Sequence, residues 1–279
     1  MTIVSEAGSP RDYPSKQVEA LIEHPLVRAV TLTGSGAAGR AVASKAGAML
    51  KKSVLELGGS DPYLVLEDAH PDSASAICAR GRLVNSGQSC IAAKRFIVVE
   101  KVRPAFEKRF VELMSRTKMR DPFEHGTEIG PLTRHDLRDT LHRQVVASVG
   151  KGARLLLGGA VPNHPGAYYP PTVLTDMRKG MPAYEEELFG PVAAPIPARS
   201  EAEAIATAND TPFGLGGAVI ARDLARGEKI AEFEIEAGMV FVTTTFVPIR
   251  ECLLEASRKA AMGANCPPTA LGSSSTSRP

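Results

Sequence analysis

The chain of 279 residues lacks several features that mark specialised classes of protein. It has no tryptophan, and aromatic residues make up only 5%. No run of about 18 apolar residues occurs, so we expect no membrane-spanning segment. The formal net charge is only +2 and no long Lys/Arg run occurs, which argues against a nucleic-acid-binding protein. Residues 1–15 lack the apolar core of a signal peptide, and we expect a cytoplasmic protein.

The cysteines are too scattered to indicate a disulfide framework or a metal site. The chain has four, Cys78, Cys90, Cys252 and Cys266, and none of them forms a C-x-x-C pair. No Cys/His cluster has metal-ligand spacing, so we expect reduced thiols and no metal ion. The six histidines are scattered as well, and none is assigned a catalytic role.

What the chain does have is an alternation of helical and strand-like runs, which is typical of an α/β fold. Hydrophobic residues at 43% and charged residues at 23% are ordinary for a globular protein. Strands are predicted at 29–33 (as a buried strand), 54–57, 63–66, 95–99, 154–157, 192–196, 217–221 and 239–242. Helices are predicted at 17–23, 37–52, 72–85, 102–116, 134–150, 201–209 and 223–234, and a Pro/Gly-rich loop at 162–171.

Two short motifs carry the most chemical information. Residues 54–60 are V-L-E-L-G-G-S and place Glu56 on a strand ahead of two glycines, while residues 85–91 are N-S-G-Q-S-C-I and place Cys90 just past a helix. A thiolate attacks carbonyl carbons well, and a nearby carboxylate can activate the water that breaks a thioester. The alternatives are a buried structural cysteine and a salt-bridged structural glutamate. Cys78 has no such context and is predicted to lie in the core.

A glycine-rich segment at 33–39, T-G-S-G-A-A-G, joins a predicted strand to a predicted helix. Such a turn exposes backbone N–H groups at a helix N-terminus, where a phosphate can bind. A lone glycine turn is a weak signal, and a plain strand-to-helix connection is the alternative. A second segment, E-E-E-L-F-G-P-V at 185–192, begins with three acidic residues. For Glu185 and Glu186 a solvated face is the simpler interpretation.

Together these segments resemble the signatures of the aldehyde dehydrogenase superfamily. The resemblance covers residues 16–242 and is strongest to succinate-semialdehyde dehydrogenases at 60–69 and 90–99. It implies an α/β fold made of part of a Rossmann-type nucleotide domain and an α/β catalytic domain. The expected division is a partial nucleotide-binding domain at 1–57, a catalytic domain at 58–242 and an aberrant, disordered tail at 243–279.

The resemblance also implies an activity, namely NAD- or NADP-dependent oxidation of a small aldehyde to the carboxylic acid. Cys90 would form the thiohemiacetal and thioester, and Glu56 would activate the hydrolytic water. Glu187 would hold the nicotinamide ribose and Phe189 would pack on the ring, since a carboxylate can accept two hydroxyl hydrogen bonds. The expected cofactor contacts are Gly34, Ser35, Gly39, Leu57, Glu187 and Phe189.

The substrate is predicted to be succinate semialdehyde, with one departure from the family pattern. Some members that oxidise this acid carry an arginine in register with Val84, whereas here Arg82 is near and is expected to point elsewhere. NAD and NADP both stay open, because the residues that contact the adenosine ribose would precede Met1.

Both ends differ from the family pattern, and we expect a chain truncated at the N-terminus and frameshifted after Val242. The family motif P-F-G-G-x-K-x-S-G-x-G-R-E is absent from the C-terminal segment. Residues 251–279 can, however, be back-translated so that a neighbouring frame encodes it. Met262–Gly263 then forces a glycine and Asn265–Cys266 a leucine, as in the family. Exposed apolar edges would follow, with poor solubility and weak or no activity.

Two other functions fit the same residues. The first is an inactive remnant that at most binds a partner or oligomerises with an intact paralogue. The family resemblance would imply a homo-oligomer, which is doubtful for this chain. The second is thiol acyl transfer without a nucleotide. Faster alkylation of Cys90 than of Cys78 would favour the enzyme over the remnant. Ester hydrolysis that needs no NAD(P) would indicate acyl transfer.

Overall fold

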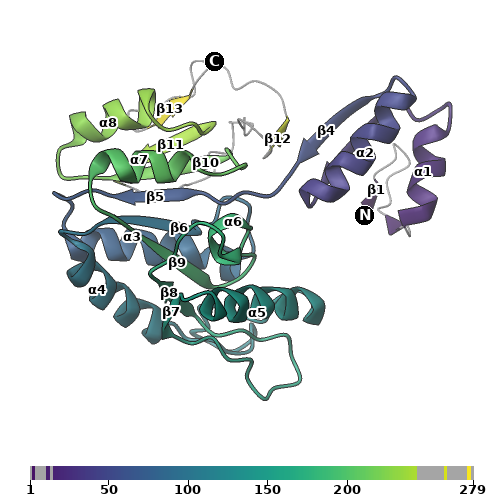
Figure 1. Cartoon of the computed structure of the whole chain (residues 1–279). Helices are drawn as coiled ribbons and strands as arrows, with labels where there is room; N and C mark the ends of the chain where they lie inside the picture. The colour runs from purple at the N-terminus through teal and green to yellow at the C-terminus, as the bar shows by residue number, and fades with distance from the viewer. Residues whose placement is uncertain (1, 4–10, 13–14, 244–260, 263–274, 278–279) are drawn as a thin grey trace.

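The computed structural model describes residues 2–3, 11–12, 15–243, 261–262 and 275–277. Two regions are visible in Figure 1, a larger one around an eight-stranded sheet and a smaller one around a three-stranded sheet. Strand β4 leads from the smaller region into the larger one. A further two-stranded sheet pairs β1 (Thr2–Ile3) with β2 (Arg11–Asp12).

The smaller region consists of α1 (Ser15–Glu23), β3 (Ala29–Thr33), α2 (Gly36–Ala48) and β4 (Lys52–Glu56), with β12 (Ala261–Met262) paired to β4. Strands β3 and β4 are parallel, with Leu32 opposite Leu55. Its buried cluster contains only six residues, Val18, Ile22, Leu32, Val42, Ala46 and Leu55. The region therefore has a small core of its own.

Strand β3 corrects one prediction from the sequence, because it is not a buried strand. Only Leu32 is buried, while Ala29, Thr31 and Thr33 are exposed. The buried residues of β3 and β4 pack against α1 and α2, and the side chains that alternate with them point the other way. The β-branched composition predicted the strand correctly but did not reveal that only one face is covered.

The larger sheet has the strand order β13-β11-β10-β5-β6-β9-β8-β7. Neighbouring strands from β11 to β8 run parallel, whereas β7 and β13 pair antiparallel at the two edges. The strands are β5 (Pro62–Val65), β6 (Arg95–Val99), β7 (Arg154–Leu157), β8 (Thr172–Thr175), β9 (Val192–Ala198), β10 (Gly216–Ile220), β11 (Met239–Val242) and β13 (Ser275–Ser277).

Helices cover both faces of this sheet, so its strands are buried on both sides. Phe96 and Val98 of β6 pack with α3 (Pro71–Leu83) and α4 (Arg103–Arg116), while Ile97 and Val99 pack with α5 (His135–Gly150), α7 (Glu201–Asn209) and α8 (Leu224–Phe233). The burial of every residue in β5, β6, β8 and β10 is typical of parallel strands between two helical layers.

Most predicted elements are confirmed to within a few residues, and three differences matter. Helix α2 ends at Ala48, because Met49 caps it and Leu50 takes a left-handed conformation with φ 54°. Helix α3 ends at Leu83 instead of continuing to residue 85. Strand β8 and the short helix α6 (Pro182–Glu185) were not predicted.

Several predictions fall partly or wholly outside the described residues. Of the tail at 243–279, the structure describes only Thr243 and the strands β12 and β13, so the proposed frameshift lies mostly beyond it, as do Cys252 and Cys266. Cys78 is fully buried in the core, as predicted. Within the part of the chain that is described, no helix is long and apolar enough to cross a membrane.

Candidate active site

The turn before Cys90 reverses the chain at the end of α3 through three successive left-handed residues. Asn85, Ser86 and Gly87 have φ values of 50°, 55° and 75° within the 3₁₀ turn η1 (Val84–Gly87). Non-glycine residues rarely adopt this conformation, and it persists only where the surroundings hold it. The motif N-S-G therefore forms a constrained backbone turn that sets where Cys90 lies.

Side-chain contacts from one neighbouring loop hold the turn. Ser86 Oγ accepts a hydrogen bond from Gly130 N at 3.1 Å. Gln88 Oε1 accepts hydrogen bonds from Thr133 N at 2.8 Å and from Thr133 Oγ1 at 2.9 Å. These contacts explain why serine and glutamine occupy their positions in N-S-G-Q-S-C.

The other side of the turn is packed against Arg82 and Gly190. Arg82 is fully buried and its Nη2 donates to Gly87 O at 2.7 Å. A Cβ on Gly87 would overlap the carbonyl group of Gly190, so the F-G-P segment and the cysteine turn approach backbone to backbone. Arg82 thus points inward and is fully buried, whereas Val84 is 37% exposed.

Cys90 lies half-buried with a free thiol. Burial raises the pKa of this thiol, the positive charge of Lys94 acts in the opposite direction, and the N–H of Ile91 also favours the thiolate. Asp61 and Glu187 raise the same pKa by their negative charge. The site therefore contains charges of both signs that set the protonation of Cys90.

Lys94 belongs to this site and was missed by sequence reasoning. Its side chain is fully buried, and its Nζ donates to three carbonyl oxygens, those of Ser89 at 3.0 Å, Cys90 at 3.0 Å and Ala92 at 2.9 Å. The Nζ also lies 3.5 Å from Oε1 of Glu187. In C-I-A-A-K-R the Lys-Arg pair has the composition of a solvated surface, and only the buried strand that follows it hints otherwise.

Glu187 lies where Gly58 and Gly59 meet the loop that carries Cys90. Its Oε1 accepts a hydrogen bond from Gly59 N at 3.1 Å, and a Cβ on Gly58 would overlap its carboxylate. Phe189 is half-buried two residues further on. Glu185 and Glu186 are exposed, as predicted for a solvated face.

Glu56 ends β4 and is half-buried, and burial raises the pKa of its carboxyl group. No hydrogen bond or ion pair joins Glu56 to Cys90 among the described residues. The two segments nevertheless meet through the glycines, because a Cβ on Gly59 would lie 2.6 Å from the carbonyl oxygen of Cys90. Gly59 therefore allows a backbone approach that a larger residue would block, and Gly58 leaves room for the Glu187 carboxylate.

The predicted cofactor residues of the smaller region gather at the ends of β3 and β4. Gly34 N donates to Glu56 O at 2.9 Å, and Ser35 Oγ caps α2 by accepting from Ala38 N at 3.3 Å. Gly39 packs against Leu57 so closely that a Cβ there would lie 2.6 Å from Leu57 Cδ2. Gly34, Ser35, Gly39 and Leu57 are thus brought together, and Leu57 connects them along the chain to Gly58 beside Glu187.

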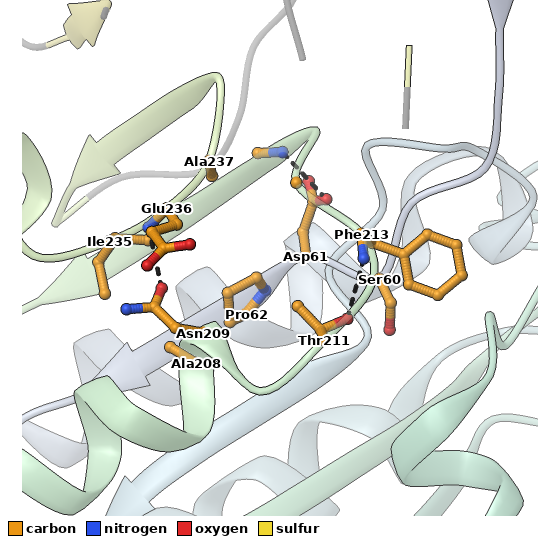
Figure 2. A pocket seen from close by; sticks show the side chains of 12 residues that line it. Ser60, Asp61, Pro62, Ala208, Asn209, Thr211, Phe213, Ile235, Glu236 and Ala237 are labelled. Atoms are coloured by element: carbon orange, nitrogen blue, oxygen red, sulfur yellow. Dashed lines mark hydrogen bonds between the residues drawn. The ribbon is translucent and has the colours of Figure 1, made fainter. Parts of the chain in front are cut away.

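A buried carboxyl group, Asp61, lies next to this site and was also missed. Its Oδ1 accepts from Gly216 N at 3.2 Å, and burial raises its pKa to about 6 although Lys94 and Arg82 act against this. Figure 2 shows Asp61 with Ser60 and Thr211 around a small pocket. Among the described residues, Asp61 Oδ2 and Ser60 Oγ have no hydrogen-bond partner.

The fold and these motifs are those of one protein family. The chain belongs to the aldehyde dehydrogenase family, whose model matches residues 10–252. This match extends a few residues beyond both ends of the resemblance seen in the sequence, residues 16–242.

Proteins with known names are similar to most of this chain. A protein of Deinococcus radiodurans named succinate-semialdehyde dehydrogenase (NADP+) is 47% identical over 225 residues, which is 81% of this chain and 47% of that protein. One of Escherichia coli named succinate semialdehyde dehydrogenase (NAD(P)+) is 46% identical over 81% of this chain and 48% of its own length. The chain spans about half the length of the curated relatives it matches.

Solved structures agree with this placement. The succinic semialdehyde dehydrogenase of Streptococcus pyogenes, solved in complex with NADP+, superposes with a TM-score of 0.86 at 33% identity and covers 90% of this chain and 55% of that one. Lactaldehyde dehydrogenase from Escherichia coli superposes with a TM-score of 0.84 at 31% identity, covering 88% of this chain and 52% of that one.

Proposed function

We propose that this chain carries the catalytic residues of an NAD(P)-dependent aldehyde dehydrogenase, with Cys90 as nucleophile and Glu56 as general base. The observation that carries the proposal is the packing of Gly58 and Gly59. These two residues follow Glu56 and lie against both the Cys90 carbonyl and the Glu187 carboxylate. The base, the nucleophile and the predicted ribose-binding carboxylate thus belong to segments in mutual contact.

The proposed chemistry at Cys90 has two stages. The thiolate adds to the aldehyde carbon to form a thiohemiacetal, and loss of a hydride leaves a thioester. Glu56 then takes a proton from water, and the hydroxide equivalent displaces the thiol to release the acid. The raised pKa of the Glu56 carboxyl group supports this role, because a stronger base accepts the proton more readily.

The residues present fit a nicotinamide dinucleotide. Helix α2 begins at Gly36 just after the Gly34–Ser35 turn, and its N-terminus is exposed and favourable for a phosphate. Glu187 uses Oε1 for Gly59 and Lys94, and Oε2 can accept a hydrogen bond from a ribose hydroxyl. Phe189 is half-buried two residues further on, and its proposed role is to pack on the nicotinamide ring. When bound, the cofactor supplies the hydride acceptor.

Succinate semialdehyde is the proposed substrate because the curated relatives are named for it. The described residues around Cys90 do not select it by themselves. Arg82 is buried against Gly87, and Val84 is apolar. The comparison that tests this part is between succinate semialdehyde and butyraldehyde, which has the same carbon chain without the carboxylate. A preference for butyraldehyde would contradict the substrate assignment and leave the reaction class intact.

The two catalytic roles are separable by pre-steady-state kinetics with NADP+ and NAD+. Cys90→Ala should form no reduced cofactor at any time. Glu56→Gln should form about one equivalent of reduced cofactor in a burst and then slow by about 10²- to 10⁴-fold, because only thioester hydrolysis needs the base. The thioester should be detectable on Cys90 by mass spectrometry.

A matched control is Glu228→Gln, which removes an exposed carboxylate from helix α8 and should leave both phases unchanged. Equal bursts in the wild type and in Cys90→Ala would contradict the role of Cys90. Absence of reduced cofactor from the folded wild-type chain, with slow alkylation of Cys90, would instead favour a non-catalytic binding protein. Ester hydrolysis without NAD(P) would indicate simple acyl transfer.

A further inference from the structure

Lys94 is the centre of a buried cluster of charged residues beneath the nucleophile loop. Arg82, Asp61 and Glu187 act on it electrostatically, together with the Cys90 thiol. Arg82, Asp61 and Lys94 are at most 1% exposed, and the Glu187 side chain is 21% exposed. Burial of this many charges is costly unless they compensate one another, and here two are positive and two negative when ionised.

The contacts of Lys94 match the hydrogen-bonding capacity of an ammonium group. An ammonium has three N–H donors, and three carbonyl oxygens of the loop accept at 2.9 to 3.0 Å. These carbonyls belong to Ser89, Cys90 and Ala92, so one side chain fixes the backbone on both sides of the nucleophile. The nearest anionic atom is Oε1 of Glu187 at 3.5 Å.

Glu187 connects the same ammonium to a third segment. The Oε1 that faces Lys94 also accepts the N–H of Gly59. Gly59 in turn lies against the carbonyl group of Cys90. Each of three segments therefore contacts the other two, directly or through Lys94. They are the loop at 89–92, the glycine pair at 58–59 and the segment that carries Glu187.

We propose that Lys94 is a positioning residue that holds the Cys90 loop in place and couples the charge of Glu187 to the reactivity of the Cys90 thiol. The inference rests on the proposed role of Cys90 as the nucleophile. It goes beyond that role, because it makes the reactivity of the thiol depend on the state of a carboxylate in a different segment of the chain.

Two opposite effects on Cys90 follow from this arrangement. The Lys94 charge favours the thiolate, whereas Glu187 disfavours it both directly and by compensating Lys94. Asp61 also disfavours the thiolate, and Arg82 repels the charge of Lys94. Since the thiolate is the reactive form, the rate of alkylation below the thiol pKa changes about tenfold for each unit of that pKa.

The test is the pH profile of Cys90 alkylation by iodoacetamide, followed by site-resolved mass spectrometry. It needs neither substrate nor cofactor. In the full chain, Lys94→Met should slow alkylation of Cys90 near neutral pH by about tenfold and move the midpoint of the profile to higher pH. Glu187→Gln should speed alkylation and move the midpoint to lower pH. Glu186→Gln, a neighbouring exposed carboxylate, is the matched control and should change neither.

The double variant distinguishes coupling from two independent effects. If Lys94 transmits the charge of Glu187, then Glu187→Gln should accelerate Cys90 less in the Lys94→Met background than in the wild type. Strictly independent fold-changes would overturn the coupling. An unchanged profile in a Lys94→Met variant with native thermal unfolding would overturn the positioning role.

Two other outcomes can be told apart from failure of the Lys94 proposal, namely misfolding of a variant and failure of the proposed dehydrogenase function. If Lys94→Met does not fold, the proposal stands or falls on Glu187→Gln, which leaves Lys94 and its carbonyl contacts in place. An unshifted midpoint there would overturn it. Aldehyde oxidation is measured separately. If the wild type oxidises no aldehyde but the variants show the predicted shifts in Cys90 alkylation, only the dehydrogenase proposal is refuted. If the wild type oxidises aldehyde but the variants show no shift, only the role of Lys94 is refuted.

Discussion

The larger and the smaller of the two sheets with parallel strands use those strands in different ways. In the larger sheet every residue of β6 is buried between two layers of helices, whereas in the smaller sheet β3 buries only Leu32. The larger region contains two extensive buried clusters and the smaller one a cluster of six residues. Because buried apolar area is the main source of stability, the smaller region should be the weaker of the two.

This difference in stability matters for the site, because the proposed base lies in the smaller region and the proposed nucleophile in the larger one. Glu56 ends a strand of the smaller sheet, while Cys90 follows a helix of the larger region. The glycine pair at 58–59 is the link between them. The geometry of the nucleophile should therefore survive perturbations that displace the base.

The largest expected effect is a core truncation in the larger sheet. Phe96 is fully buried, with its ring centroid 5.1 Å from that of Phe110 and 6.1 Å from that of Tyr63. Phe96→Ala should lower the free energy of unfolding by about 3–5 kcal/mol, because it leaves a cavity. Urea denaturation measures this change.

Leu32→Ala is the corresponding truncation in the smaller sheet, and it tests whether the smaller region opens independently of the larger one. It should accelerate amide hydrogen exchange in β3 and β4 while leaving β6 protected. Equal acceleration in β6 would show that the two regions open as one cooperative unit, contrary to the difference in their cores.

A smaller effect is expected at Gly87 of the cysteine turn, and Gly126, a glycine elsewhere in the chain with a similar φ, is its matched control. Gly87 has φ 75° and no room for a Cβ, whereas Gly126 has φ 80° and nothing within 4 Å. Gly126→Ala should cost only the left-handed backbone, about 1–2 kcal/mol. Gly87→Ala should cost more and should also slow alkylation of Cys90. Equal losses of unfolding free energy in the two variants, with unchanged alkylation of Cys90, would mean that the Gly190 backbone can move to accommodate a Cβ at position 87.

The smallest effect is expected in α2, which contains another matched pair. Gly47 is exposed with nothing within 4 Å, so Gly47→Ala should stabilise the chain by about 0.5–1 kcal/mol through helix propensity. Gly39→Ala should lose this gain, because Leu57 must move, and should weaken binding of NADP+ in a fluorescence titration. Equal stabilisation by both changes would indicate that the contact between Gly39 and Leu57 is loose.

Much of the fold was predictable because periodicity and turn residues mark its longer elements. Strand β6 and helix α7 have the predicted bounds. Strand β8, T-V-L-T, was missed because it is short, buried on both faces and without alternation. The exposed face of β3 was missed because composition predicts a strand and not what covers it.

The site was predictable only where a motif marks it. Cys90 and Glu56 were found from N-S-G-Q-S-C and E-L-G-G, and their roles stay predictions. Lys94 and Asp61 were missed, because a charged residue normally indicates solvent and no local pattern shows that a lysine will be buried under three carbonyl groups. Such residues depend on contacts between distant segments, which only the folded structure reveals.

The strand order of the larger sheet also determines when the chain can fold. Strand β5, which begins just after the glycine pair, lies between β6 and β10, and Tyr63 is paired in register with Ala218. Nearly all of the described chain must therefore leave the ribosome before β5 has both of its neighbours. Contacts between such distant segments slow folding, and until β10 arrives one edge of β5 is open to pairing with other chains. Slower translation or a chaperone that shields this edge should thus raise the yield of native protein.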